Sequence, residues 1–324
     1  GIIHDLRSDN KTIVYISHKL DELFRIADRY IVMRDGCCIE SGDMQGMNHD
    51  SLIQKMVGRE IKLIHNRYEG GAGKEELLRL ENICLRHPLK NDTNLLTNIS
   101  LHLGKGEILG LFGLMGAGRT ELMETIFGMH PRLGSGTIHI SGRPVAIHSP
   151  AEAIKAGIAL VPEDRKNDGL FLDLDVRTNI SITTLENMEA GIFLNNQQET
   201  ALAQKYIKEL KIKTPTDKMP AGNLSGGNQQ KIVIAKWLAK KPKILMLDEP
   251  TRGIDIHAKN EIYKLILQLA EAGLGIILVS SELPEILAVT DRVMVLSEGR
   301  LTADIATKDA TENILLKAAI PKTN

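Results

Sequence analysis

The sequence has few cysteines and no long apolar stretch. Its 324 residues include only three cysteines, Cys37, Cys38 and Cys84. Two of these are adjacent and none has CxxC spacing, which argues against a disulfide framework or a cysteine metal site. No run approaches the roughly 18 apolar residues that span a bilayer, and residues 1–10 lack the basic-then-apolar pattern of a secretory signal. These absences predict a protein of a reducing compartment, held at a membrane only through a partner.

Net charge is almost absent as well. Forty basic residues against forty-one acidic ones leave a formal charge of −1, so nothing attracts the chain as a whole to nucleic acid or anionic lipid. Four histidines, His130, His139, His148 and His257, show no metal-ligand spacing and are interpreted as surface or hydrogen-bonded side chains. With 43% hydrophobic and 25% charged residues, the composition indicates a soluble globular protein with room for one large domain and part of another.

Two segments of the chain repeat each other. Residues 13–36 align without gaps with residues 276–299, at a constant offset of 263 positions. The two segments share their pattern of residue types, although many aligned residues differ. In both copies a β-branched run leads into a serine, a helical apolar pattern follows, and an Asp-Arg pair opens a second apolar run. This pattern predicts a strand, a helix and a second strand in each copy.

The repeat also predicts the domain organisation. The second copy closes a complete domain, whereas the first copy starts almost at residue 1, so we expect residues 1–66 to be the C-terminal remnant of a similar domain. Residues 67–76 are Gly-rich and charged, which is typical of a linker. Residues 77–324 are then the complete domain. The alternative, a surface loop at residues 67–76 within a single domain, stays open.

A glycine-rich loop follows the short apolar run Glu107–Phe112, and a helical pattern continues to about Phe127. Glycines allow backbone N–H groups to surround phosphate oxygens, and the helix start adds partial positive charge. The hydroxyl of Thr120 would then bind Mg²⁺. Arg119 stands where such loops usually have lysine, and its planar fork changes the geometry at the γ-phosphate. The predicted phosphate-binding residues are Gly113, Gly116, Ala117, Gly118, Arg119 and Thr120.

A second apolar run, from Ile244 to Leu247, ends in two carboxylates. Such a run is typical of a buried parallel strand that delivers ligands at its carboxyl end. Asp248 is predicted to hold Mg²⁺, and Glu249 is predicted to polarise the attacking water as the catalytic residue. Taken alone, the segment could also be an ordinary strand end.

The segment LSGGNQQK, which starts at Leu224, resembles the signature motif of ABC ATPases. Ser225, Gly226 and Gly227 would lie at the start of a helix that runs to about Ala239, with backbone donors for an anion. The resemblance implies an α/β P-loop NTPase fold, with a mixed core sheet, an antiparallel β subdomain near residues 76–106 and a helical subdomain near residues 173–221. It also implies that the signature faces the γ-phosphate bound by an opposing domain.

Several positions depart from the pattern of that family. Glu163 stands where ABC ATPases usually have a glutamine that contacts Mg²⁺ and water, and Ser281 stands where they usually have a histidine. The earlier copy of the repeat has His18 at the position of Ser281. Both residues are still expected at the nucleotide. The triplet Gly253–Asp255 resembles the D-loop of the family.

The motifs VPEDRK, LSGGNQQK and EPTRGID together resemble the ATP-binding subunits of bacterial monosaccharide importers. This resemblance implies ATP and Mg²⁺ as ligands and import of a sugar, ribose-like above others. The implied partners are a second nucleotide-binding domain of the same chain or of a dimer, membrane permease subunits, and indirectly a periplasmic sugar-binding protein. It further implies a peripheral position at the cytoplasmic face of the inner membrane, a permease contact on residues 163–179, and no nucleic acid.

Two other classes share these motifs. ABC-type DNA-repair ATPases insert a long coiled coil before the signature, but the stretch from Gly118 to Leu224 is short and has no sustained heptads. Translation-factor ATPases generally keep a lysine at the position of Arg119 and have a long charged linker. Salt-dependent binding to nucleic acid would separate both classes from an importer subunit.

Overall fold

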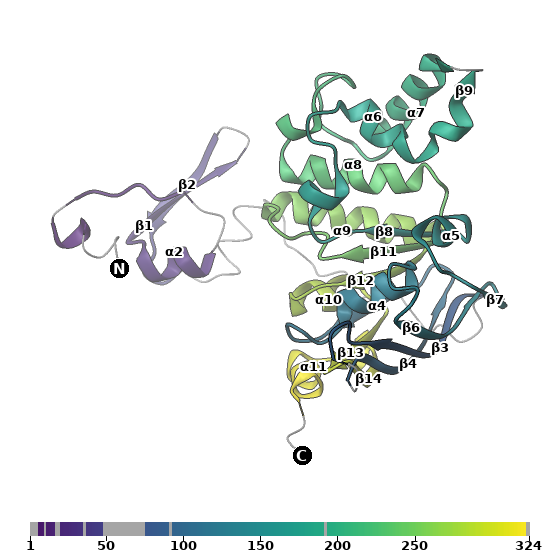
Figure 1. Cartoon of the computed structure of the whole chain (residues 1–324). Coiled ribbons are helices and arrows are strands. Elements are labelled where there is room, and N and C mark those ends of the chain that lie inside the picture. The colour runs from purple at the N-terminus through teal and green to yellow at the C-terminus, as the bar shows by residue number, and fades with distance from the viewer. Residues whose placement is uncertain are drawn as a thin grey trace. The chain divides into compact units, whose positions relative to one another are not determined.

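The computed structural model describes residues 6–9, 11–16, 20–34, 37–47, 75–90, 93–190 and 193–321 (Figure 1). The chain divides into two compact units: the first comprises residues 1–63 and 255–260, and the second comprises the remaining residues. His18 and residues 67–74 of the predicted linker lie outside the described residues. Among those that are described, no helix is long and apolar enough to cross a membrane.

The second unit is built around a six-stranded sheet in the order β14-β13-β5-β12-β11-β8. Strands β8, β11, β12, β5 and β13 are parallel, and β14 joins the edge antiparallel to β13. Every residue of β5, β11 and β12 is buried, as expected for parallel strands covered on both faces. The predicted mixed core sheet is therefore confirmed. In sheet order the strands are Arg300–Ala306, Arg292–Ser297, Ile108–Phe112, Gly275–Val279, Ile244–Asp248 and Ile158–Val161.

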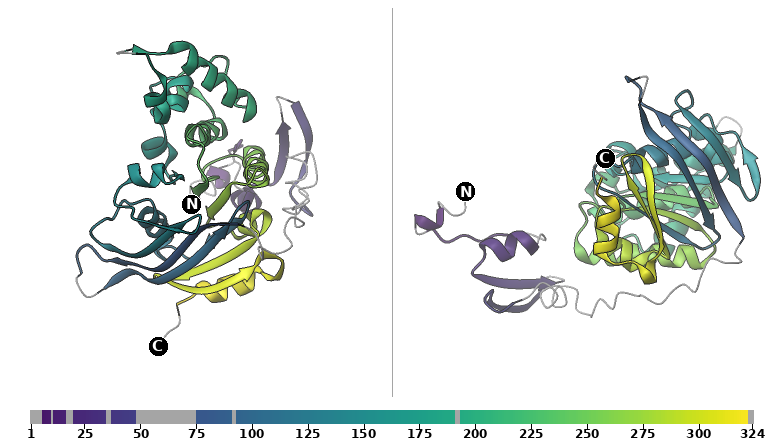
Figure 2. Two further views of the ribbon diagram at one scale, coloured as in Figure 1. Left: turned by 90° about the vertical axis from the view of Figure 1, so that its right-hand side faces the viewer. Right: turned by 90° about the horizontal axis from the view of Figure 1, so that it is seen from below.

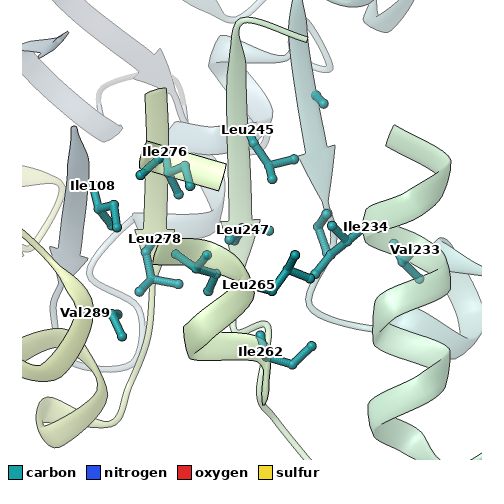
Figure 3. Packing of buried hydrophobic residues seen from close by; sticks show 14 of the residues in the cluster. Ile108, Val233, Ile234, Leu245, Leu247, Ile262, Leu265, Ile276, Leu278 and Val289 are labelled. Carbon is teal, nitrogen blue, oxygen red and sulfur yellow. The ribbon is translucent and has the colours of Figure 1, made fainter. Parts of the chain in front are cut away.

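Helices cover the two faces of this sheet through separate apolar clusters. Figure 3 shows one cluster, in which Val233 and Ile262 on helices lie against Leu245, Leu247 and other strand residues. The other face packs against α4, α5 and a second sheet. Trp237 touches both clusters, and its ring meets Phe127 edge-on with centroids 5.8 Å apart. The helices are α4 Arg119–Ile126, α5 Pro150–Lys155, α8 Gly226–Leu238, α9 Ile256–Glu271, α10 Leu283–Val289 and α11 Glu312–Ala319.

The second sheet is antiparallel, in the order β4-β3-β6-β7. Its first two strands, β3 Glu76–Arg86 and β4 Asn94–Gly104, confirm the antiparallel region predicted near residues 76–106. Two further strands, β6 Gly134–Ile140 and β7 Arg143–Val145, complete it beyond the predicted range. In both views of Figure 2 the dark-blue strands β3 and β4 lie beside the yellow β13 and β14, where Thr97 N–H donates to Gly299 O at 2.8 Å.

The region predicted as a helical subdomain contains α6 Val176–Ser181, the 3₁₀ turns of Ile182–Met188 and α7 Asn196–Glu209. A short pair of strands, β9 Glu189–Ala190 and β10 Phe193–Leu194, lies between them. Both helices begin at side-chain caps, because Asp175 accepts from Thr178 N–H and Asn195 accepts from two backbone N–H groups. Helix α6 packs against α7 and α8, and the Tyr206 hydroxyl of α7 donates to Leu238 O of α8 at 2.8 Å (Figure 1). The predicted helical subdomain is confirmed.

The first unit repeats part of the second. Its helix α2 Leu20–Ile26 and strands β1 Arg29–Arg34 and β2 Cys37–Asp43 have bounds 263 positions before those of α10, β13 and β14. Both hairpins are antiparallel, and both have a register shift at the same place, between Val32 and Met33 in one and between Val295 and Leu296 in the other.

The strand predicted at the start of the first copy is wrong. Residues 11–16 have no regular secondary structure, and Val14 and Ile16 are 87% and 94% exposed. The matching strand β12 is held between β11 and β5. No strand pairs with residues 13–16 within the described part of the first unit. A β-branched run alone does not form a strand without neighbours on which to pair and pack.

The repeat supplies a matched pair of core substitutions. Leu296 is fully buried, whereas Met33 at the corresponding position is 67% exposed. In this chain we expect Leu296→Ala to lower the unfolding free energy by about 3 kcal/mol, because it leaves a cavity. Met33→Ala should change it by less than about 0.5 kcal/mol. Urea unfolding followed by circular dichroism tests this, and equal losses for the two variants would contradict the assigned burial.

Candidate functional site

The glycine-rich loop lies between the end of β5 at Phe112 and the start of α4 at Arg119. Gly116 and Gly118 have φ values of 80° and 97°, a conformation that residues with a Cβ rarely adopt. Ala117 N–H donates to Leu114 O within the loop. The N-cap of α4 is Gly118, which has no side chain to cap the helix, so among the described residues the first N–H groups of α4 are available to an anion. The loop therefore has the geometry of a phosphate cradle.

Asp248 lies directly beside this cradle. The Thr120 hydroxyl donates to Asp248 Oδ2 at 2.9 Å. The contact follows from the sheet, because β5 and β11 both flank β12 in parallel and their carboxyl ends meet at one edge. Burial raises the pKa of Asp248 to about 6, and the hydrogen bond from Thr120 only partly opposes that shift.

The residues present fit a Mg²⁺ ion. Asp248 is 3% exposed, and its second oxygen, Oδ1, is buried without a hydrogen-bond partner. A buried carboxylate oxygen with no donor is costly, and a hard cation that prefers oxygen ligands removes that cost. Thr120 and Asp248, the predicted metal residues, are thus brought together with a free oxygen at the cradle.

Glu249 follows Asp248 and is held by two other predicted residues. Arg119 Nη1 lies 3.3 Å from Glu249 Oε1, and Ser281 Oγ donates to Glu249 Oε2 at 3.2 Å. Both carboxylate oxygens of Glu249 therefore have a partner, and the guanidinium of Arg119 faces this glutamate. A base held on both oxygens must give up one contact before it can accept a proton from water.

Glu163 lies in the wall of a pocket of about 630 Å³ that Thr120 and Asp248 also line. Its carboxylate forms an ion pair with Arg252. The structure thus brings Glu163 into one pocket with Thr120 and Asp248, and its contact with the nucleotide stays a prediction. The partner of the carboxylate is a residue that the sequence did not indicate.

The signature residues occupy a different place. Ser225 precedes α8, is exposed, and accepts a hydrogen bond from Asn228 Nδ2 at 2.9 Å. The residues that line the pocket with Thr120 and Asp248 include none of Ser225, Gly226 and Gly227. The described structure therefore keeps the signature apart from the cradle of its own domain, with the first turn of α8 open to another partner.

Sequence reasoning missed Glu285, which lies behind the site. This side chain is 2% exposed and accepts hydrogen bonds from Thr251 Oγ1 at 2.9 Å and from the hydroxyl of Ser280. It thereby ties the segment after Asp248 to the end of β12. A signal was available, because the repeat keeps a serine and a glutamate at the same two positions, Ser17 and Glu22.

The chain is similar to proteins of known family. Residues 96–252 match the family model described as ABC transporter. The second unit therefore has the fold of an ABC ATPase domain. A nucleotide-free ATP-binding cassette from an ABC transporter superposes with a TM-score of 0.65 at 21% identity, covering 76% of this chain and all of that one. The predicted fold class is confirmed.

Curated relatives match beyond the ABC ATPase domain. The ribose import ATP-binding protein RbsA of Rhodopirellula baltica is 47% identical over 99% of this chain. The xylose import ATP-binding protein XylG of Yersinia pestis is 43% identical over 98%. The chain spans 63% and 62% of the lengths of these two relatives.

The raised pKa of Asp248 gives a prediction for the metal-free ABC ATPase domain. Because the folded pKa of about 6 lies above the ordinary 3.8, the contribution of Asp248 to stability is complete below pH 3.8 and is lost as pH rises through 6. Asp248→Asn removes the buried charge, so at pH 8 in EDTA it should raise the unfolding free energy by up to about 3 kcal/mol.

At pH 4 the same substitution should change stability little, because Asp248 is then protonated and neutral. Urea unfolding at the two pH values measures both effects. A destabilisation of equal size at pH 4 and pH 8 would show that the carboxylate is not the strained group.

Proposed function

We propose that this chain binds Mg²⁺-ATP at the glycine cradle and takes part in ATP hydrolysis that powers import of a monosaccharide, ribose-like above others. The observation that carries the proposal is the contact of Thr120 with Asp248 beneath the cradle, which leaves Asp248 Oδ1 free for a metal. The relatives named as ribose, xylose and arabinose import ATP-binding proteins, 42–47% identical, support the substrate class.

Each site residue then has a distinct role. The backbone N–H groups between Gly113 and Thr120 hold the triphosphate, and Thr120 with Asp248 holds Mg²⁺, which when bound neutralises charge between the β- and γ-phosphates. Glu249 orients and deprotonates the attacking water. Glu163 and Ser281 lie around the γ-phosphate. The remaining group, Ser225–Gly227, serves a nucleotide bound by the opposing domain.

The domain assignment is part of the proposal. Residues 1–66 are the C-terminal remnant of a first nucleotide-binding domain, residues 67–76 are the linker, and residues 77–324 are the second domain. The support is the repetition of α10, β13 and β14 in α2, β1 and β2, including the shared register shift. The opposing domain is then the first domain of the same chain or that of a dimer partner.

The proposed partners follow from the same assignment. Permease subunits contact residues 163–179, where Phe171 and Leu174 expose apolar side chains, 53% and 42% accessible. Buried Asn179 fixes this loop through two hydrogen bonds to the backbone of Phe171. Its side-chain Oδ1 accepts from Phe171 N–H, and its Nδ2 donates to Phe171 O. A periplasmic sugar-binding protein acts indirectly through the permease, and the chain lies at the cytoplasmic face of the inner membrane. Nucleic acid is not a proposed partner.

The two nucleotide sites of such a protein are unequal in this proposal. The site of the described domain has Arg119, Glu163 and Ser281 in place of the usual groups, and Glu249 is engaged on both oxygens. Losing one electrostatic contact at a reacting group typically costs 10²–10³ in rate. Hydrolysis therefore occurs mainly where Ser225–Gly227 meets the phosphate loop of the opposing nucleotide-binding domain.

A matched pair of threonines on α4 tests nucleotide binding. Thr120→Ala should weaken ATP binding roughly tenfold in the presence of Mg²⁺, because it removes a metal ligand, and should have little effect in EDTA. Thr125, whose hydroxyl donates to Glu121 O on the same helix, provides the control Thr125→Ala. Isothermal titration measures the affinities. Equal affinities for the two variants in Mg²⁺ would remove Thr120 from the site.

A second experiment tests the asymmetry in the longer two-domain protein. Ser225→Arg should reduce steady-state ATP turnover about a hundredfold, because a bulky cation blocks the signature that serves the active site. Glu249→Gln should leave a substantial fraction of the activity. The reverse result, with Glu249→Gln nearly inactive and Ser225→Arg active, would mean that the active and weak sites have been exchanged.

A further inference from the structure

We infer that Arg165 is a positioning residue that joins three segments of the domain: the turn Arg165–Gly169, the turn after Glu249, and the start of the signature helix α8. The consequence drawn below for ATP turnover rests on the proposed function, whereas the contacts themselves do not. The sequence singled out VPEDRK only as a family motif, and the proposed mechanism gives Arg165 no role.

The contacts of Arg165 are concentrated on its guanidinium group. Nη1 donates to Arg252 O at 2.7 Å, and Nη2 donates to Gly253 O at 3.3 Å. Nη2 also lies 2.8 Å from the point where a Cβ on Gly226 would stand. A planar fork with several donors can span two carbonyls, which a lysine ammonium cannot do in the same way. One side chain therefore contacts the turn at 252–253 and the first residue of α8 together.

A second contact runs between the same two segments. Glu163, two residues before Arg165, pairs through its carboxylate with the side chain of Arg252. Asp164, which lies between them, accepts hydrogen bonds from the N–H groups of Lys166 and Asn167. Three of the four charged residues of the motif thus divide two tasks, because Asp164 fixes its own turn while Glu163 and Arg165 hold the segment after Glu249.

The far end of the turn is anchored on α8 as well. Lys236, 7% exposed, donates from Nζ to Gly169 O at 2.6 Å. A Cβ on Gly169 would lie 3.1 Å from Val233, so the backbone approaches α8 closely. The turn therefore contacts α8 at both ends, near Gly226 through Arg165 and near Lys236 through Gly169. Turn and helix are joined at these two points, and Arg165 attaches the 252–253 segment to them.

This arrangement has a mechanical consequence. The turn is part of the surface proposed for the permease at residues 163–179, while Ser225–Gly227 and Gly253–Asp255 are segments that face an opposing domain in the proposed function. A displacement of the turn reaches both segments through Arg165. This side chain also lines the pocket of Thr120 and Asp248, but its hydrogen bonds to Arg252 O and Gly253 O do not involve the glycine cradle. Loss of Arg165 should consequently affect turnover rather than nucleotide affinity.

Amide hydrogen exchange on the 324-residue chain tests the local claim. In Arg165→Ala, exchange at the N–H groups of Arg252, Ile254 and Gln229 should become roughly tenfold faster, because the hydrogen bonds that hold these turns are lost. Exchange in β3 and β4, the melting temperature and ATP affinity should stay unchanged. Lys166→Ala, one residue further along and exposed, is the control and should leave all rates unchanged.

Gly226→Ala supplies a second variant that tests the same contact from the other side. Its Cβ would displace the flexible end of Arg165, so exchange at Arg252 and Ile254 should again accelerate, although these residues are distant in sequence. In the double variant Arg165→Ala/Gly226→Ala, exchange at Arg252 and Ile254 should be no faster than in Arg165→Ala alone. Arg165→Lys, which keeps the charge, should restore protection only in part.

The turnover consequence is measured in the longer two-domain protein, where Arg165→Ala should lower kcat about tenfold with KM unchanged. Unchanged exchange at Arg252 and Ile254 in both Arg165→Ala and Gly226→Ala would overturn the inference. So would faster exchange throughout the domain with a lower melting temperature, because Arg165 would then be a general stabilising residue. A failure of ATP to bind would refute the proposed function and leave the exchange pattern to decide the role of Arg165.

Discussion

The parallel pairing of β5 and β11 with the strand between them, β12, is the constraint on which the site depends. Because all three strands run in one direction, the loop after β5 and the carboxylates after β11 meet at one edge. The alignment places the Thr120 hydroxyl within hydrogen-bond distance of Asp248. The apolar clusters on both faces exclude water from the strands, and the same exclusion raises the pKa of Asp248.

Burial at this edge links stability to function. A carboxylate held in an apolar setting, with one oxygen unpartnered, weakens the fold when no cation is present. The same arrangement gives a cation a strong reason to bind, since the ion supplies the missing partner. Glu249 illustrates a different solution, because its charge is satisfied within the protein by Arg119 and Ser281. Asp248 and Glu249 thus differ in how strongly a bound cation would stabilise them.

Local signals were sufficient to predict much of the fold. Glycines that need positive φ, such as Gly116 and Gly118, and apolar strands that end in carboxylates have the same meaning wherever they occur. The strand predicted at residues 13–16 was wrong, because strand formation depends on neighbours that a local pattern does not specify.

The contacts that long side chains make could also not be predicted from the sequence. Arg119 was predicted to contact phosphate, and in the structure its guanidinium lies against Glu249. No contact was predicted for Arg165, which donates hydrogen bonds to the carbonyls of Arg252 and Gly253. Long flexible side chains select partners from distant segments, and spacing along the chain does not reveal that choice. The proposed roles of Ser225–Gly227 stay predictions, since the partner proposed for them belongs to an opposing domain.

The packing of Phe127 against Trp237 has a practical consequence. Phe127 directly follows α4, the helix that starts at the phosphate cradle, and Trp237 lies on α8, the helix that starts at the signature. Trp237 is the only tryptophan in the chain. Its indole meets Phe127 across the two helices, so we expect its emission to change when α4 and α8 move relative to each other. The protein thus contains a natural optical probe between the helix after the glycine-rich loop and the helix after Ser225, and no dye needs to be attached to follow their movement.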